Sequence, residues 1–360
     1  MKFFTLLAVT FLLFVPNLLF AQQAIEARQV DAVIVEMLQE LENESGVGNY
    51  IFNAKTEYGE VFEVNTSDSY LAGVGYDLNA GDRVSLQVVD TAEGVRVYFE
   101  DVHREMSLLW IAIIFAIIAV LVGRWRGVLS LVGLVVTVLI LFGFLFPAIL
   151  AGRDPVIFTV LASIVILAVN MHISHGVRKQ TFLAFLGTVA GLILVIVFSK
   201  LFVEMASLSG LAGEEATLLF WETGGVQLPV GILTAGIILG AVGVLDDVAI
   251  TQSEVVGELL LANPNTKKKE LFVKAMRIGR HHIASTVNTL VLVYAGAALP
   301  VFLLYIYGDH SLQTFFGNEL IGEEIVRTLA GTCALVLTVP ISTWFATLAP
   351  RVVDSNQKCH

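Results

Sequence analysis

The chain has 360 residues, of which 56% are hydrophobic and 15% are charged. An ordinary soluble domain carries about 25% charged residues, so this composition excludes an ordinary soluble protein. It predicts a polytopic α-helical membrane protein whose main partner is the lipid bilayer. The formal net charge is −11, and residues 22–106 account for it, with 17 Asp and Glu against five Lys and Arg. This acidic region argues against nucleic acid as a partner.

The N-terminal part of the chain predicts an exported domain. Met1-Lys2 and the apolar run to Ala21 form the pattern of a signal peptide, which stays as a signal anchor if it is not cleaved. Residues 22–105 then alternate apolar and polar positions between turn residues, which predicts a small β-rich extracytoplasmic domain, an antiparallel barrel or sandwich of OB-like type. The expected strands are 30–35, 50–52, 60–64, 84–89 and 95–99.

A membrane domain of residues 106–350 follows, and residues 351–360 form a tail. About seven apolar segments are long enough to cross a bilayer: 107–123, 128–149, 156–174, 182–203, 228–250, 282–306 and 326–348. With the N-terminal domain outside, the inner loops and tail hold 12 Lys and Arg, and the outer ones hold three. This bias predicts a multi-pass protein with a cytoplasmic C-terminus.

The long loop before the sixth segment has a pattern of its own. Residues 253–261 are amphipathic, and Thr266 stands where it would cap a basic helix that ends near Arg280. We therefore expect two helices that lie along the inner membrane interface.

Two adjacent carboxylates, Asp246 and Asp247, lie in the fifth apolar segment. An ionisable residue inside a bilayer helix costs roughly 2.5 to 3.5 kcal/mol and by default marks a functional site. The pair is suited to carry a proton or to coordinate a cation. The alternative, which the sequence leaves open, is that both residues sit at the inner interface and end the span.

The fifth segment also carries a strip of small residues. One helical face, at positions i, i+4, i+7 and i+11, holds Gly236, Gly240, Gly243 and Asp247. Small residues permit a neighbouring helix to approach closely, so we expect the strip to pack against a helix and to bring Asp247 into that interface. The same strip would also suit a dimer.

The sixth segment begins with polar residues that are candidates to support the aspartates. They form neighbouring stripes that include His281, Ser285, Asn288 and Thr289, and all lie near the predicted inner side. Asn288 and Thr289 are the expected hydrogen-bond partners within the membrane, whereas His281 is equally compatible with an interfacial position. His172 and His175 have metal-ligand spacing, but without a second motif they do not predict a metal site.

The stretches GVLDDVAITQSEVV, from Gly243 to Val256, and RIGRHHIASTVNTL, from Arg277 to Leu290, resemble the YibE/F family of bacterial membrane proteins. The resemblance extends to the export segment, the small outer domain and the multi-span bundle. It implies a protein of the bacterial cytoplasmic (inner) membrane. It supplies no catalytic residues and no activity.

A more local resemblance points to transport. The helix that ends in Asp-Asp-Val-Ala-Ile is similar to the central segment of resistance-nodulation-division transporters and of the SecD and SecF export subunits. It implies that Asp246 and Asp247 form a proton site, with Asn288 and Thr289 beside it. Here, however, the pair lies on the fifth predicted span and not the third, and the predicted spans contain a single lysine, Lys200, at the outer end of the fourth.

The leading hypothesis is an ion-coupled transporter or a transport-associated component that uses the aspartate pair. The alternative is a membrane scaffold or sensor whose outer domain binds an envelope partner. A membrane enzyme is a third hypothesis, which receives no support from a nucleophile motif or a P-loop. No cofactor motif is present in the sequence, and the chain is compatible with an oligomer.

Overall fold

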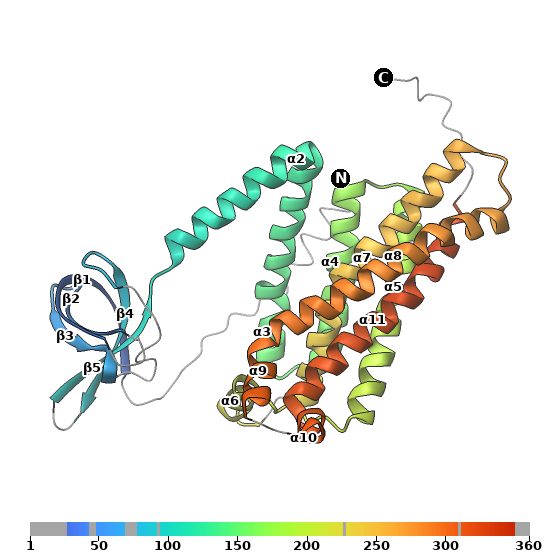
Figure 1. Ribbon diagram of the computed structural model, residues 1–360. Helices are drawn as coiled ribbons and strands as arrows, with labels where there is room; N and C mark the ends of the chain where they lie inside the picture. The colour runs from blue at the N-terminus through green and yellow to red at the C-terminus, as the bar shows by residue number, and fades with distance from the viewer. Residues whose placement is uncertain are drawn as a thin grey trace. The chain divides into compact units, whose positions relative to one another are not determined.

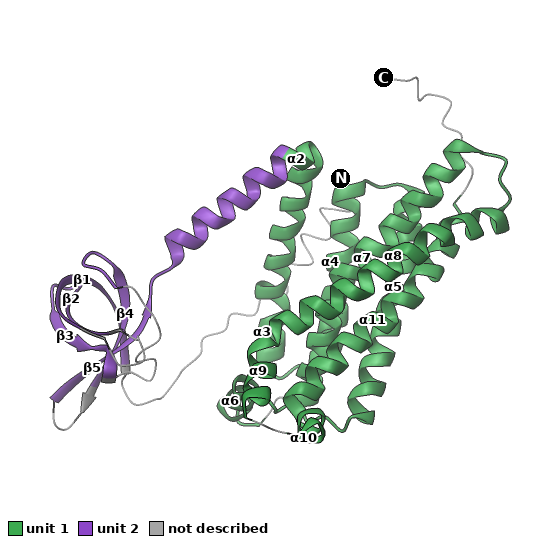
Figure 2. Cartoon of the chain, in the orientation of Figure 1, with its two compact units in different colours: residues 1–17, 122–360 green, residues 18–121 purple. Residues whose placement is uncertain are grey.

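The structure, a computed structural model, describes residues 27–42, 48–68, 78–91, 94–225, 228–308 and 311–349. The expected signal segment 1–21 and the tail 351–360 lie outside these residues. The chain divides into two compact units, which Figure 2 shows in different colours. Unit 2 holds residues 18–121, and unit 1 holds residues 122–360 together with residues 1–17.

Unit 2 contains a five-stranded antiparallel sheet with the strand order β3-β2-β1-β4-β5 (Figure 1). The strands are β1 (Ala27–Glu42), β2 (Gly48–Thr56), β3 (Val61–Asn65), β4 (Arg83–Thr91) and β5 (Gly94–Val102), and the short 3-10 helix η1 (Thr66–Asp68) follows β3. β3 also contacts β5, so the sheet curls into a half-barrel. All five predicted strands are confirmed; four are longer than predicted, and β3 has the predicted length but begins one residue later.

Alternation explains the core of this sheet. Buried residues such as Ile34, Phe52, Val64 and Leu86 point to the inner face of successive strands. The ring of Phe52 meets that of Phe99 edge-on, with 6.3 Å between centroids. β1 shifts its register against β2 twice, and such bulges bend a strand as a curled sheet requires.

From Glu105 on, the described residues are mostly helical. The helices are α2 (Glu105–Ile140), η2 (Leu141–Leu145), α3 (Phe146–Leu150), α4 (Pro155–His175), α5 (Lys179–Met205), α6 (Glu214–Glu222), α7 (Pro229–Ala262), α8 (Lys268–Ala297), α9 (Leu299–Tyr307), α10 (Leu312–Gly317) and α11 (Glu319–Ala346). In unit 1, α5, α7 and α11 contact one another most extensively and α4 packs against α7 (Figure 1).

Several of these helices are apolar enough to cross a membrane. Among the described residues five qualify by length and composition, or six if α8 and α9, bent by 63°, make one span. The first two predicted segments lie in one helical stretch, Glu105–Leu150, whose backbone leaves helical geometry at Arg124 (φ 50, ψ −131). The structure thus has membrane-type helices where all seven segments were predicted, while the number of crossings stays a prediction.

The prediction of two separate helices along the inner interface is wrong. Residues 253–261 continue α7, and the basic residues up to Arg280 belong to α8, which runs on to Ala297. Thr266 does not cap that helix, because Lys267 is the N-cap and the Thr266 hydroxyl donates to the Asn263 carbonyl. The apolar faces of these extensions pack together around Val256 and Leu271, which explains why they remain helical.

Candidate functional site

α7 presents its two carboxylates differently. Asp246 is half-buried, and its Oδ1 atom is buried without a hydrogen-bond partner among the described residues. Asp247 is exposed. This reverses the expected order of burial, in which the glycine strip carried Asp247 into a helix interface. The buried side of α7 lies instead on residues such as Val242, Leu245 and Ala249.

Asp247 lines a cavity of about 550 Å³ in unit 1. Its charged and titratable lining comes from three helices: Arg126 of α2, His175 of α4, and Asp247, Glu254 and Glu258 of α7. Three carboxylates face one guanidinium group there. Such an excess of negative charge concentrates cations and protons near a site.

The α7 contribution to this cavity follows from helical spacing. Glu254 and Glu258 stand seven and eleven residues after Asp247, so all three side chains project from one face of the helix. Thr251, four residues after Asp247, lines the same cavity. The sequence therefore contained the signal, because extending the glycine strip by the same period reaches these carboxylates.

Asn170 of α4 lies at the level of Asp246. α4 and α7 run in the same direction, since a methyl group added at Gly231 would lie 3.4 Å from Pro155, and His175 and Ile250 line one small cavity further along. Gly231 and Pro155 are neighbours, and Asp246 and Asn170 each lie fifteen residues further along their helices. This equal spacing places Asn170 at the level of Asp246. Asn170 donates to Thr137 of α2 at 3.0 Å, and its Oδ1 atom is buried without a partner among the described residues.

The polar residues of α8 are not brought to the aspartates. His281, Ser285, Asn288 and Thr289 are all exposed. The face of α8 that packs against α7 and α11 carries Gly279, Ile283 and Leu290 instead. Of the four, Thr289 has a local bond, with its hydroxyl donating to the Ser285 carbonyl at 3.0 Å. Among the described residues, no contact of these four side chains with Asp246 or Asp247 supports the predicted role.

The two spaced histidines also separate. His172 lies 2.7 Å through Nδ1 from the Ala168 carbonyl and meets the Phe185 ring, whereas His175 lines the α7 cavity. Within the described ranges, no three His, Cys, Asp or Glu side chains converge on a common point that would hold a metal ion.

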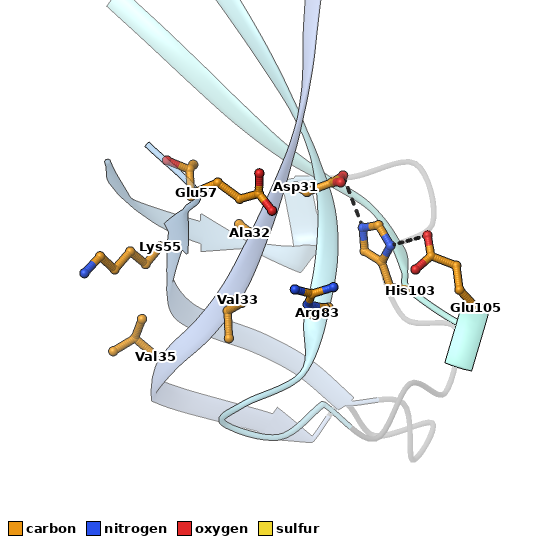
Figure 3. Close-up of a pocket in the computed structure, with 10 residues that line it drawn as sticks. Asp31, Ala32, Val33, Val35, Lys55, Glu57, Arg83, His103 and Glu105 are labelled. Atoms are coloured by element: carbon orange, nitrogen blue, oxygen red, sulfur yellow. Dashed lines mark hydrogen bonds and ion pairs between the residues drawn. The ribbon is translucent and has the colours of Figure 1, made fainter. Parts of the chain in front are cut away.

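Unit 2 has a polar groove of its own (Figure 3). Two adjoining cavities, of about 320 and 900 Å³, share the lining residues Asp31, Glu57, His103 and Glu105. His103 lies between two carboxylates, 3.2 Å from Asp31 of β1 and 3.0 Å from Glu105, the first residue of α2. The pKa of His103 is raised, chiefly by the hydrogen bond to Glu105 and against a smaller effect of burial, with Asp31 adding to the rise.

The sequence profile of the YibE/F-like protein family matches residues 111–351. The chain belongs to the YibE/F-like family. The matched region of this family contains α7, its carboxylates and every residue that lines the cavity beside Asp247. It begins after the half-barrel, so the resemblance of the outer domain is not part of the match. No curated protein and no solved structure matches the chain.

Four polar contributors to the YibE/F-like site were not predicted from the sequence: Arg126, Asn170, Glu254 and Glu258. Arg126 was counted only as a basic loop residue, because the sequence placed a loop where α2 merely departs from helical geometry at Arg124. Asn170 carried no signal, since its relation to Asp246 depends on how α4 is set against α7.

Proposed function

We propose that this YibE/F-like chain is an ion-coupled transporter, or a component of a transport assembly, in the bacterial cytoplasmic membrane. Asp246 and Asp247 are the coupling residues in this proposal. The observation that carries it is the buried, unpartnered Oδ1 atom of Asp246 beside Asp247, which lines a cavity rich in carboxylates. A proton or a cation would supply the partner that the Asp246 oxygen lacks.

The division of labour follows from the two surroundings. Asp247 exchanges the ion with water in the cavity, where Glu254 and Glu258 add to the local negative charge. Asp246 holds the ion inside the bundle. Binding one proton neutralises one of the two carboxylates and so alters the charge that α7 presents to its neighbours. We propose that this change shifts α7 and α8, and that the half-barrel faces the outside of the cell.

Proton movement into proteoliposomes tests the proposal. An imposed pH gradient is read with an internal pH dye for the wild type, for the Asp246→Asn/Asp247→Asn double variant and for Glu204→Gln. Glu204 is an exposed carboxylate near the end of α5 and serves as the matched control. We expect the double variant to lose the flux and the control to keep it. Equal flux in all three proteins would contradict the role of the pair.

A second function is favoured by the groove of unit 2. Its charged walls and its exposed side chains, such as Val35 and Tyr58, suit a scaffold or sensor that binds an envelope partner. Deleting residues 22–104 separates the two functions. The transporter proposal expects the deleted protein to keep its proton flux, whereas the scaffold proposal expects cellular function to vanish with the deletion and to survive the double Asp→Asn change.

A further inference from the structure

One face of α7 runs past the aspartates toward both ends of the helix. Toward Ala262 it carries the carboxylates of the cavity, and toward Pro229 it carries three glycines, Gly243, Gly240 and Gly236. We call these directions the Ala262 end and the Pro229 end of the bundle. From Gly236 to Asp247 the face covers about 16 Å, at a rise of about 1.5 Å per residue.

Polar side chains, and not a closely packed helix, lie against the glycines nearest the Pro229 end, of which Gly236 is half-buried and Gly240 is exposed. A methyl group added at Gly240 would lie 2.8 Å from the hydroxyl oxygen of Tyr294, on α8. One added at Gly236 would lie 3.1 Å from Nη1 of Arg327, on α11. The missing side chains of α7 thus leave the room that these two large polar groups occupy.

Arg327 is held in this position by charge. Its Nε atom lies 3.4 Å from Oε1 of Glu324, and their side chains are 25% and 27% exposed. Glu323, on the same turn of α11, has a buried Oε1 atom without a hydrogen-bond partner among the described residues. Placing an arginine inside a membrane-type helix costs free energy, and such residues are by default functional. We therefore expect this cluster to have a function.

The covering stops at Tyr294. A methyl group added at Gly243 would meet no atom within 4 Å, and the next residue on this face, Asp247, opens on the cavity. Tyr294 also stands at the end of α8, where its carbonyl accepts from Ala298 and the chain bends by 63° into α9. Broken helices often form the substrate and ion sites of transporters.

We propose that Tyr294 and Arg327 control access to the aspartate pair. They close the glycine face toward the Pro229 end, so that ions reach Asp247 only from the Ala262 end, and a change at the α8–α9 bend would withdraw Tyr294. This inference rests on the proposed function, because it names the residues that regulate the same site. It assigns Tyr294 and Arg327 as positioning residues that do not themselves bind the ion.

Sided labelling of a single cysteine tests the proposal. Cys333 and Cys359 are replaced by Ser in the full chain, and Gly243→Cys introduces the probe position, which has room for a side chain. A membrane-impermeant maleimide is applied to right-side-out cells and to inverted vesicles. The same labelling is repeated with Tyr294→Ala, with Arg327→Gln, and with Tyr294→Phe as the matched control that keeps the ring.

We expect the probe to react only from the side of the Ala262 end. Tyr294→Ala or Arg327→Gln should add reaction from the opposite side, and Tyr294→Phe should not. Reaction of the parent from the Pro229 end, no reaction from either side, or an unchanged pattern in both opening variants that still fold would overturn the proposal.

This readout is independent of transport. The parent alone tests the closed face, so the proposal stays falsifiable even if Tyr294→Ala fails to fold. A one-sided pattern in a protein without Asp-dependent proton flux would contradict the proposed function and keep the closure. Asp-dependent flux together with labelling of the parent from both sides would support the proposed function and contradict the closure.

Discussion

Asp246 and Asp247 are neighbours in the chain, yet their side chains meet different surroundings, because a helix turns by about 100° per residue. Asp246 is half-buried, and its Oδ1 atom has no hydrogen-bond partner among the described residues, whereas Asp247 is exposed and lines the cavity. The sequence showed that two carboxylates lie in an apolar helix. It did not show which is buried, because that depends on which sides of α7 its neighbours cover.

His103 offers a pH-dependent test at the same scale. Its pKa lies above the ordinary value of 6.5, so its pairing with Asp31 and Glu105 stabilises unit 2 fully below about pH 6.5 and is lost as the pH rises through the raised pKa. Other charged groups near it are Arg28, Glu57, Arg83, Asp101 and Arg104. The partners of His103 are exposed, which limits the effect to about 1 kcal/mol.

The change His103→Gln should therefore lower thermal stability near pH 5.5 and matter progressively less above pH 7. Unfolding of the full-length protein across this range, followed through the β-sheet signal, measures the difference. His281→Gln is the control, because His281 is exposed on α8. A stability gap between wild type and His103→Gln that grows with rising pH would contradict the assignment.

At the scale of elements, α5 and α11 approach each other closely. A methyl group added at Gly187 would lie 3.0 Å from the Cα atom of Ser342, and one added at Gly191 would meet the Thr338 hydroxyl. These glycines have the same four-residue spacing as Gly236 and Gly240, whose partners are side chains. Sequence spacing identifies both strips, but only the tertiary arrangement tells which one receives a helix backbone.

Replacing Gly187 by Ala should force α5 away from α11 and destabilise unit 1 by about 1–3 kcal/mol, the usual cost of overpacking. Thermal unfolding in detergent of Gly187→Ala against Gly243→Ala checks this. Gly243 has free space for the added methyl group, so its variant should unfold like the wild type. Equal stability of the two variants would refute the close contact.

Across the whole molecule, the predictable features are those set by local periodicity. Alternating residues located all five strands, and apolar length located the membrane-type helices. The sequence did not locate the backbone change at Arg124 or the 63° bend between α8 and α9. Both depend on how neighbouring helices pack. The bend lies between Ala297 and Leu299, one helical turn after Tyr294, the residue on which our access proposal depends.

The proposed transport role depends on the aspartate pair acting as two different groups. Proton flux into proteoliposomes, measured for Asp246→Asn and Asp247→Asn separately, is therefore the most direct test. We predict that Asp246→Asn abolishes the flux. Asp247→Asn should slow the flux, and the flux that remains should depend on Asp246. Wild-type flux in both single variants would contradict the account.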